Sequence, residues 1–231
     1  MGKRVLITGS NRGIGFEFVR QYLEDGWRVY ATCRRPSDSQ ELNRLLQVYQ
    51  ELSIHRLDIT VQEDISNLCH EVDGVPIDLL VNNAGVYFKS MRPEIGCLHY
   101  DYWLRTLEVN TLGTIRITEA LLDNIGKSRK HRLIAVLSSD DDNVPGCGRP
   151  PDIYYRSSKA ALNAAMQALS LKLLKQDIGV LLLHPGSVVT RMGSDNGISA
   201  QRSVVGMRDV IESFDREQSG HFLYYDGTAV S

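Results

Sequence analysis

The sequence lacks a long apolar run, an excess of basic charge and any clear pairing of its cysteines. Nothing along the 231 residues is apolar for long enough to span a bilayer, so we expect no membrane insertion. A formal net charge of −2 gives no positive field for phosphate backbones, which argues against a nucleic-acid partner. The four cysteines fit neither a zinc site nor a disulfide scaffold, and the N-terminal residues show no signal or lipidation motif. We therefore expect a cytoplasmic protein without a metal site.

Short hydrophobic runs alternate with amphipathic helical stretches along the whole chain, as they do in βαβ units. Buried parallel strands are typically continuous hydrophobic runs, because helices cover both of their faces. The pattern predicts one α/β domain over residues 1–231, a Rossmann-type doubly wound parallel sheet of about seven strands with helices on both faces. The predicted strands are Arg4–Thr8, Arg28–Thr32, Ser53–Leu57, Asp78–Asn82, Arg132–Ser138, Val180–His184 and His221–Tyr225. The predicted helices are Ile14–Glu24, Asp38–Glu51, Glu63–Glu71, Tyr102–Asn124, Tyr155–Lys175 and Ser203–Phe214.

A glycine-rich turn follows the first predicted strand and leads directly into a helix. Gly9 would let the chain turn tightly, Gly13 would let a pyrophosphate approach the backbone, and Gly15 would let helix and strand pack closely. The free N–H groups and positive dipole of the helix N-terminus would then bind phosphates. The spacing is longer than that of G-x-G-x-x-G, so a structural turn without a ligand is the alternative. The candidate phosphate-binding residues are Gly9, Ser10, Asn11, Arg12, Gly13, Ile14 and Gly15.

The end of the second predicted strand indicates which nicotinamide cofactor is bound. A carboxylate there would bind the ribose 2′-hydroxyl of NAD(H), but the segment Ala31–Arg35 contains none and includes Cys33. Arg34 and Arg12, with Arg35 as a further candidate, have the charge to bind a 2′-phosphate. We therefore predict NADP(H) rather than NAD(H). The alternative is that these arginines are ordinary surface charge.

Tyr155 and Lys159 are four residues apart at the start of a predicted helix, so they share one helix face. A free phenol has a pKa of about 10, and a nearby ammonium stabilises the phenolate and lowers that pKa. A tyrosine and a lysine at this spacing also occur by chance, with the ring stacked on the lysine stem. The pair therefore gains its significance from the motifs around it.

Other motifs accompany this pair in a fixed order along the chain. They are Thr8–Gly15, Asn82-Asn83-Ala84-Gly85, Asn110, Ser138-Ser139, Tyr155 with Lys159, and Pro185-Gly186. Together they resemble the short-chain dehydrogenase/reductase family, from the first strand to the last residues. Residues 155–165 and 225–228 are similar to the branch of this family that contains C-factor and the sniffer carbonyl reductase.

The resemblance implies a catalytic role for four residues. Tyr155 would be the general acid when a ketone or aldehyde is reduced, and the base when a secondary alcohol is oxidised. Lys159 would lower the pKa of Tyr155 and bind the nicotinamide ribose. Ser139 would donate a hydrogen bond to the substrate oxygen, and Asn110 would hold a water that links Lys159 to solvent.

The resemblance also implies the remaining cofactor contacts. The residues expected around adenine and its ribose are Asp58, Ile59, Asn82 and Ala84, and Cys33 and Gly85 are further expected cofactor contacts. Those expected to seat the nicotinamide are Pro185, Gly186, Val188 and Thr190. From the residues alone, Asn110 could instead cap a helix, Asp58 could be a turn acid, and Pro185-Gly186 could be a plain turn.

Two loops differ from the pattern of the family. Three acids, Asp140–Asp142, follow Ser139 where the family has small or apolar residues. They would favour a cationic or polar substrate, oppose the Tyr155 phenolate, or simply face solvent. Ser138 is a rival to Ser139 as the catalytic hydroxyl. The stretch Arg191–Gly197 is short and polar, which suggests a shallow substrate pocket.

The predicted function is therefore NADP(H)-dependent reduction of a small-molecule carbonyl compound, or oxidation of the corresponding alcohol. The alternative is an NADP(H)-binding sensor or signalling protein on the same fold with little turnover. Small residues on more than one face of the helix from Tyr155 favour a homodimer or homotetramer, or burial under the chain's own loops. Substrate identity and reaction direction are left open, because loops build the pocket.

Overall fold

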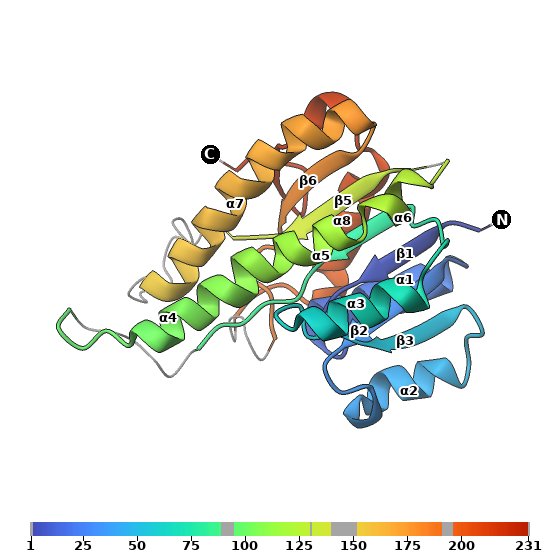
Figure 1. The fold of residues 1–231 in the computed structure, drawn as a ribbon, viewed down its shortest axis with the longest axis horizontal. Helices are drawn as coiled ribbons and strands as arrows, with labels where there is room; N and C mark the ends of the chain where they lie inside the picture. Colours follow the sequence, from blue (N-terminus) through green and yellow to red (C-terminus); the bar gives the residue numbers. More distant parts are fainter. Residues whose placement is uncertain (1, 89–94, 130, 140–151, 191–195, 231) are drawn as a thin grey trace.

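One parallel sheet organises the chain (Figure 1). The computed structural model describes residues 2–88, 95–129, 131–139, 152–190 and 196–230. The strand order is β3-β2-β1-β4-β5-β6-β7, and every neighbouring pair is parallel. The strands are β1 (Arg4–Ile7), β2 (Arg28–Cys33), β3 (Leu52–Arg56), β4 (Leu79–Asn82), β5 (Leu133–Leu137), β6 (Gly179–His184) and β7 (Phe222–Tyr224). The order reverses between β1 and β4, which makes this the place where such sheets bind ligands.

Helices cover both faces of the sheet (Figure 1). The core on one face includes residues of α1 (Gly13–Glu24), α2 (Gln40–Leu46) and α8 (Ala200–Glu212). The core on the other face includes residues of α3 (Gln62–Glu71), α5 (Thr114–Ala120) and α7 (Ile153–Leu173). The remaining α-helices are α4 (Tyr100–Leu107) and α6 (Leu122–Gly126), and no described helix is long and apolar enough to cross a membrane.

Strand β5 explains why the buried strands are hydrophobic without interruption. Leu133, Ala135 and Leu137 pack into the core beneath α1 and α8. Ile134 and Val136, which alternate with them, pack into the core beneath α5 and α7. Each face of the strand is covered, so every position excludes water. The predicted fold class is thereby confirmed, and each predicted strand overlaps an observed one.

Two predicted helices differ from the observed ones: one is shorter and the other is divided. The predicted helix over Asp38–Glu51 is limited to α2, preceded by a short 3₁₀ turn at Pro36–Asp38. The predicted helix over Tyr102–Asn124 is divided into α4, a π-helical turn at Glu108–Gly113, α5 and α6. Within the π turn the buried Asn110 binds the backbone of a distant segment, and Gly113 packs against a neighbouring side chain. Periodicity therefore found the helical region, but tertiary contacts changed its winding.

Helix α7 positions the candidate catalytic pair and is fixed at its start. Asp152 caps the helix, because its carboxylate accepts hydrogen bonds from the N–H groups of Tyr154 and Tyr155 at 2.9 and 3.2 Å. The hydroxyl of the buried Tyr154 accepts from the backbone N–H of His99 at 2.6 Å. The Trp103 indole N–H on α4 donates to Ser157 on α7 at 2.7 Å. Figure 1 shows α4 and α7 side by side.

Leu162→Ala tests whether the packing of α7 on the sheet stabilises the fold. Leu162 is 1% exposed in the core beneath α7, so its truncation should lower the free energy of unfolding by about 2–5 kcal/mol. Leu171 on the same helix is 68% exposed, and Leu171→Ala should change this free energy by less than about 0.5 kcal/mol. Urea unfolding monitored by circular dichroism measures both. Equal losses in the two variants would contradict this packing.

Candidate active site

A cleft of about 740 Å³ opens along the carboxyl ends of six strands. It receives residues that follow β1, β2, β3, β4, β5 and β6, and two residues of α7. The predicted site residues that line it are Gly9, Asn11, Arg12, Gly13, Ile14, Cys33, Arg34, Asp58, Ile59, Ala84, Gly85, Tyr155, Lys159, Pro185 and Thr190. Residues separated by most of the chain therefore meet in one concave site.

The glycine turn requires glycine at Gly9 and Gly15, the first and third of its glycines, for steric reasons. Gly9 has φ +67°, and a Cβ there would lie 2.9 Å from the Cα of Ala84. A Cβ on Gly15 would overlap the side-chain amide of Asn83. Gly13 has φ +56° and lies at the start of α1, whose first turn carries no acidic residue. The helix N-terminus can therefore bind an anion over a side-chain-free backbone.

Hydrogen bonds fasten this turn to the end of β4. The Thr8 hydroxyl accepts from the backbone N–H groups of Asn83 and Ala84, both at 3.0 Å. The Asn83 side chain donates to the carbonyl oxygens of Thr8 and Gly9, at 2.8 and 3.0 Å. Asn83 lines the cleft and was missing from the predicted site. Asn83 belongs to the motif Asn82-Asn83-Ala84-Gly85, but its partners are about 75 residues away in the chain, so the motif did not indicate these bonds.

Several predicted cofactor residues lie outside the lining of the cleft. The Ser10 hydroxyl is buried and donates to the carbonyl of Ile7 at 2.7 Å, so it stabilises the turn. The Asn82 amide donates to the hydroxyl of Thr118 on α5 at 2.9 Å. Each of these side chains forms a hydrogen bond with another part of the protein and so stabilises the structure around the cleft. The full set outside the lining is Ser10, Gly15, Asn82, Gly186 and Val188 among the cofactor residues, and Asn110 and Ser139 among the catalytic ones.

One end of the cleft is rich in arginine. Arg12, Arg34 and Arg44 line it, together with the acids Asp38 and Glu41. Arg44 on α2 was not among the predicted site residues, because the sequence pattern of an amphipathic helix does not show which of its arginines faces a binding site.

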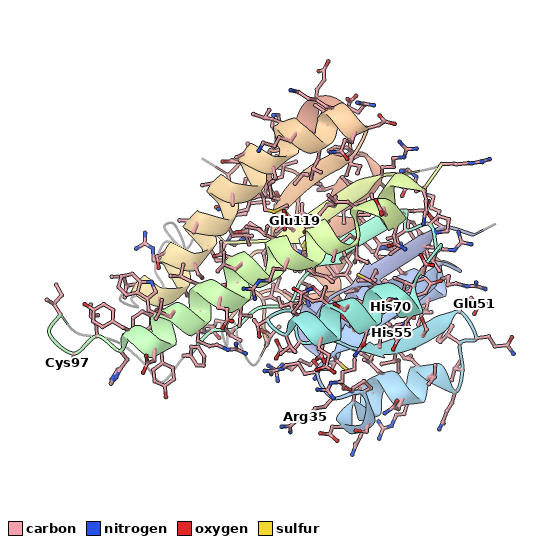
Figure 2. All side chains as sticks on the ribbon, viewed as in Figure 1. Arg35, Glu51, His55, His70, Cys97 and Glu119 are labelled. Atoms are coloured by element: carbon pink, nitrogen blue, oxygen red, sulfur yellow. The ribbon has the colours of Figure 1, made fainter. Side chains whose placement is uncertain are left out.

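Arg35, the further candidate, is not among the lining residues. Its side chain is 82% exposed and 3.9 Å from the carboxylate of Asp38. Figure 2 shows it at the surface beside the start of α2.

Asp58, two residues after the end of β3, is held by a network of contacts that the sequence did not reveal. Burial by itself would raise the pKa of Asp58, but hydrogen bonds from the Thr60 hydroxyl and N–H, with Arg105 and Arg34 nearby, lower it overall. Arg105 of α4 lies 3.8 Å from the Asp58 carboxylate and also lines the cleft. The carboxylate is therefore ionised and oriented, which suits a hydrogen-bond acceptor.

Lys159 and Tyr155 lie together on the wall of the cleft that α7 provides. The Lys159 ammonium is buried, donates to the carbonyl of Leu137 at 2.9 Å, and lies 5.7 Å from the centre of the Tyr155 ring. Burial lowers the pKa of Lys159 to about 8. A cation beside the phenol favours its ionised form. Both side chains thus lie on one face of α7.

The two candidate serines differ in their surroundings. Ser138 lines the cleft, and its buried hydroxyl has no hydrogen-bond partner among the described residues. Ser139 is partly buried, and its hydroxyl lies 3.4 Å from Nε2 of His184. Asp140–Asp142 and most of the stretch Arg191–Gly197 lie outside the described residues.

Asn110 is buried with its side chain engaged by the protein. Its Oδ1 accepts from the N–H of Val86 at 2.8 Å, and its Nδ2 donates to the Val86 carbonyl and to the Ser158 hydroxyl, both at 3.0 Å. The side chain thus ties the π turn to α7 and to the segment after β4. Both amide hydrogens of Asn110 are therefore used within the protein, and only a second lone pair of Oδ1 or the backbone is left to bind a water.

The strand order and the cleft at its switch point are those of a doubly wound α/β protein with a Rossmann-type fold. Residues 3–200 match the family model described as short chain dehydrogenase, and the chain belongs to this family.

Relatives place it near one branch of the family. The chain is 38% identical to C-signal of Myxococcus xanthus over 159 residues, which cover 67% of this chain and 92% of that protein. The NADPH-bound carbonyl reductase from chicken fatty liver superposes with a TM-score of 0.89 at 28% identity, covering 100% of this chain and 99% of that one. The carbonyl reductase Sniffer of D. melanogaster gives 0.88 at 28% identity, with 100% of both chains covered.

Lys159→Met tests whether the ammonium is buried at an energetic cost. The pKa of Lys159 falls from its ordinary 10.5 to about 8 on folding, so protonation costs stability below about pH 8. This cost disappears as the pH rises from about 8 to about 10.5. At pH 7 the variant should raise the free energy of unfolding of the cofactor-free protein by roughly 1–3 kcal/mol, and the gain should shrink toward pH 10.

The matched control is Lys172→Met, which changes an exposed lysine of the same helix. Its effect on the free energy of unfolding should stay within about 0.5 kcal/mol at both pH values. A Lys159→Met variant that is less stable than the native protein at pH 7 would argue against a desolvated charge at this position.

Proposed function

We propose that this chain is an NADP(H)-dependent carbonyl reductase that reduces a ketone or aldehyde, and oxidises the secondary alcohol in reverse, with Tyr155 as its general acid and base. The observation that supports this most is the buried ammonium of Lys159 beside the Tyr155 ring, in the same cleft as the glycine turn. The membership in the short-chain dehydrogenase family agrees with it.

The residues present fit a nicotinamide dinucleotide. Gly9 and Gly13 have positive φ and leave the backbone open beside the N-terminus of α1, where a pyrophosphate would bind. Asp58 and Ile59 would hold the adenosine, and Pro185 and Thr190 would seat the nicotinamide. When bound, the reduced cofactor supplies a hydride to the carbonyl carbon of the substrate.

The side chains then donate the proton and stabilise the charges that form during the reaction. Tyr155 gives its phenolic proton to the substrate oxygen as negative charge grows there. Lys159 stabilises the phenolate that remains, because its charge lies beside the ring in a region that excludes water. The Ser139 hydroxyl donates a hydrogen bond to the same substrate oxygen, with Ser138 as its rival for this role.

The arginine-rich end of the cleft supports NADP(H) over NAD(H). Arg12 and Arg34, with Arg44, would bind the 2′-phosphate by charge-assisted hydrogen bonds. The acids that share this end, Asp38 and Glu41, would face the cations rather than the phosphate. The similar chicken enzyme was solved with NADPH bound.

Turnover with a panel of aldehydes and ketones, measured as NADPH oxidation, tests the activity. Tyr155→Phe keeps the ring and removes the proton, so it should lower kcat about 10²- to 10⁴-fold while NADPH binding stays within about twofold. Ser139→Ala should lower kcat less than Tyr155→Phe does, by roughly 10²-fold, and Ser138→Ala should lower it less than Ser139→Ala does. NADPH binding without turnover on any compound would instead support a sensor, and full turnover in Tyr155→Phe would exclude the proposed role.

Arg34→Ala tests the cofactor preference, with Arg35→Ala as the matched control. Loss of a charged partner of the 2′-phosphate should weaken NADPH binding roughly tenfold or more and leave NADH binding within about twofold. Arg35 lies outside the lining, so its replacement should change neither affinity by more than about twofold. Titration of protein fluorescence with each cofactor gives the four affinities. A native protein that binds NADH as tightly as NADPH would refute the preference.

A further inference from the structure

His184, the last residue of β6, connects two parts of the site that the proposed mechanism treats separately. Its imidazole is buried, with 6% of the residue exposed. Nδ1 accepts a hydrogen bond from the backbone N–H of Gly186 at 2.9 Å. Nε2 lies 3.4 Å from the hydroxyl of Ser139, which follows β5. One ring thus joins the Pro185-Gly186 turn to the candidate catalytic serine.

The contact with Gly186 determines which nitrogen carries the proton. A backbone N–H can only donate, so Nδ1 must be unprotonated, and the neutral imidazole carries its hydrogen on Nε2. Nε2–H therefore donates to the oxygen of Ser139. The serine accepts this bond, so the bond does not use the hydroxyl's own hydrogen. The 3.4 Å separation is long for such a bond, as catalytic hydrogen bonds often are before a substrate is bound.

Rings from β7 hold the imidazole in this orientation. The centres of the His184 and Tyr224 rings are 4.9 Å apart, and those of His184 and Phe222 are 6.3 Å apart. Gly186 has φ +78°, so the turn has the left-handed conformation that directs its N–H back to Nδ1. The donor at Nε2 is thereby preorganised before any substrate arrives.

We propose that His184 is a positioning residue: it donates to Ser139 so that the serine hydrogen is directed to the substrate oxygen, and it fixes the Pro185-Gly186 turn beside the nicotinamide. This inference rests on the proposed function. A hydroxyl that accepts a hydrogen bond becomes a better donor, so the histidine also strengthens the bond from Ser139 to the substrate oxygen. Pro185 lines the cleft, and the turn that it begins is held from behind by the same ring.

The tautomer can be measured without any turnover. Long-range ¹H–¹⁵N correlation spectra of the full chain with ¹⁵N-labelled histidine distinguish protonated from bare ring nitrogens for the six histidines. The signals that vanish in His184→Phe belong to His184. We expect a bare Nδ1 and a protonated Nε2 at pH 7.5. A proton on Nδ1 would overturn the proposal, whatever the activity of the protein.

Two substitutions separate the two contacts of the ring. His184→Asn keeps an acceptor at the position of Nδ1 but has no atom at Nε2, so kcat should fall roughly 5- to 10-fold while KM for NADPH stays within twofold. His184→Gln places an amide N–H₂ at the position of Nε2 and loses the acceptor for Gly186. This variant should keep most of kcat and raise KM for NADPH roughly 5- to 10-fold. A merely structural role would lower stability in both without this split.

A double substitution tests whether the effect on kcat passes through Ser139. In a Ser139→Ala background, His184→Asn should lower kcat no further, because the partner of Nε2 is gone. The matched control is His221→Asn, an exposed histidine just before β7, which should leave kcat and KM unchanged. Native kcat in His184→Asn, or an undiminished further loss in the Ser139→Ala background, would overturn the proposal. Absent turnover in the native protein would refute the proposed reductase instead, and the tautomer measurement would still decide the arrangement of His184.

Discussion

The buried ammonium of Lys159 is the constraint on which the rest of the site depends. Its hydrogen bond to the carbonyl of Leu137 places a positive charge between α7 and the end of β5, where burial lowers its pKa to about 8. A charge in this place costs free energy that hydrophobic packing must offset. Helix α7 is accordingly fixed at two places. Asp152 caps its first turn, and Met166, further along the helix, is fully buried in the core. Tyr155 is presented to the cleft by a helix that cannot easily shift.

The cleft itself is a consequence of parallel strand topology. Strands that all run the same way end at the same edge of the sheet, so the residues after β1, β4, β5 and β6 meet although they are far apart in the chain. The bonds between Thr8 and Asn83 then lock the first two of these ends together.

Polar residues around the cleft divide into those that face it and those that shape it. Asp58 and Lys159 line the cleft, whereas the side chains of Ser10 and Asn110 form hydrogen bonds with backbone groups of the protein. The second group positions the backbone that the first group needs. His184 shapes the backbone through its bond with Gly186, and it also contacts Ser139, the candidate catalytic serine.

The sequence alone determined the features that depend on local physics. Continuous apolar runs identified the seven strands because both faces of a parallel sheet are covered, and the spacing of Tyr155 and Lys159 placed both on one helix face because helical geometry is fixed over four residues. Only the tertiary structure decided which side chains enter the cleft. Arg105 on α4 lines it and Asn82 at the end of β4 does not, because each side chain is directed by a distant partner, Thr60 and Thr118 respectively, 45 and 36 residues away in the chain. The interruption of the long predicted helix has the same cause: Asn110 is held by backbone 24 residues away, a contact that no periodicity encodes.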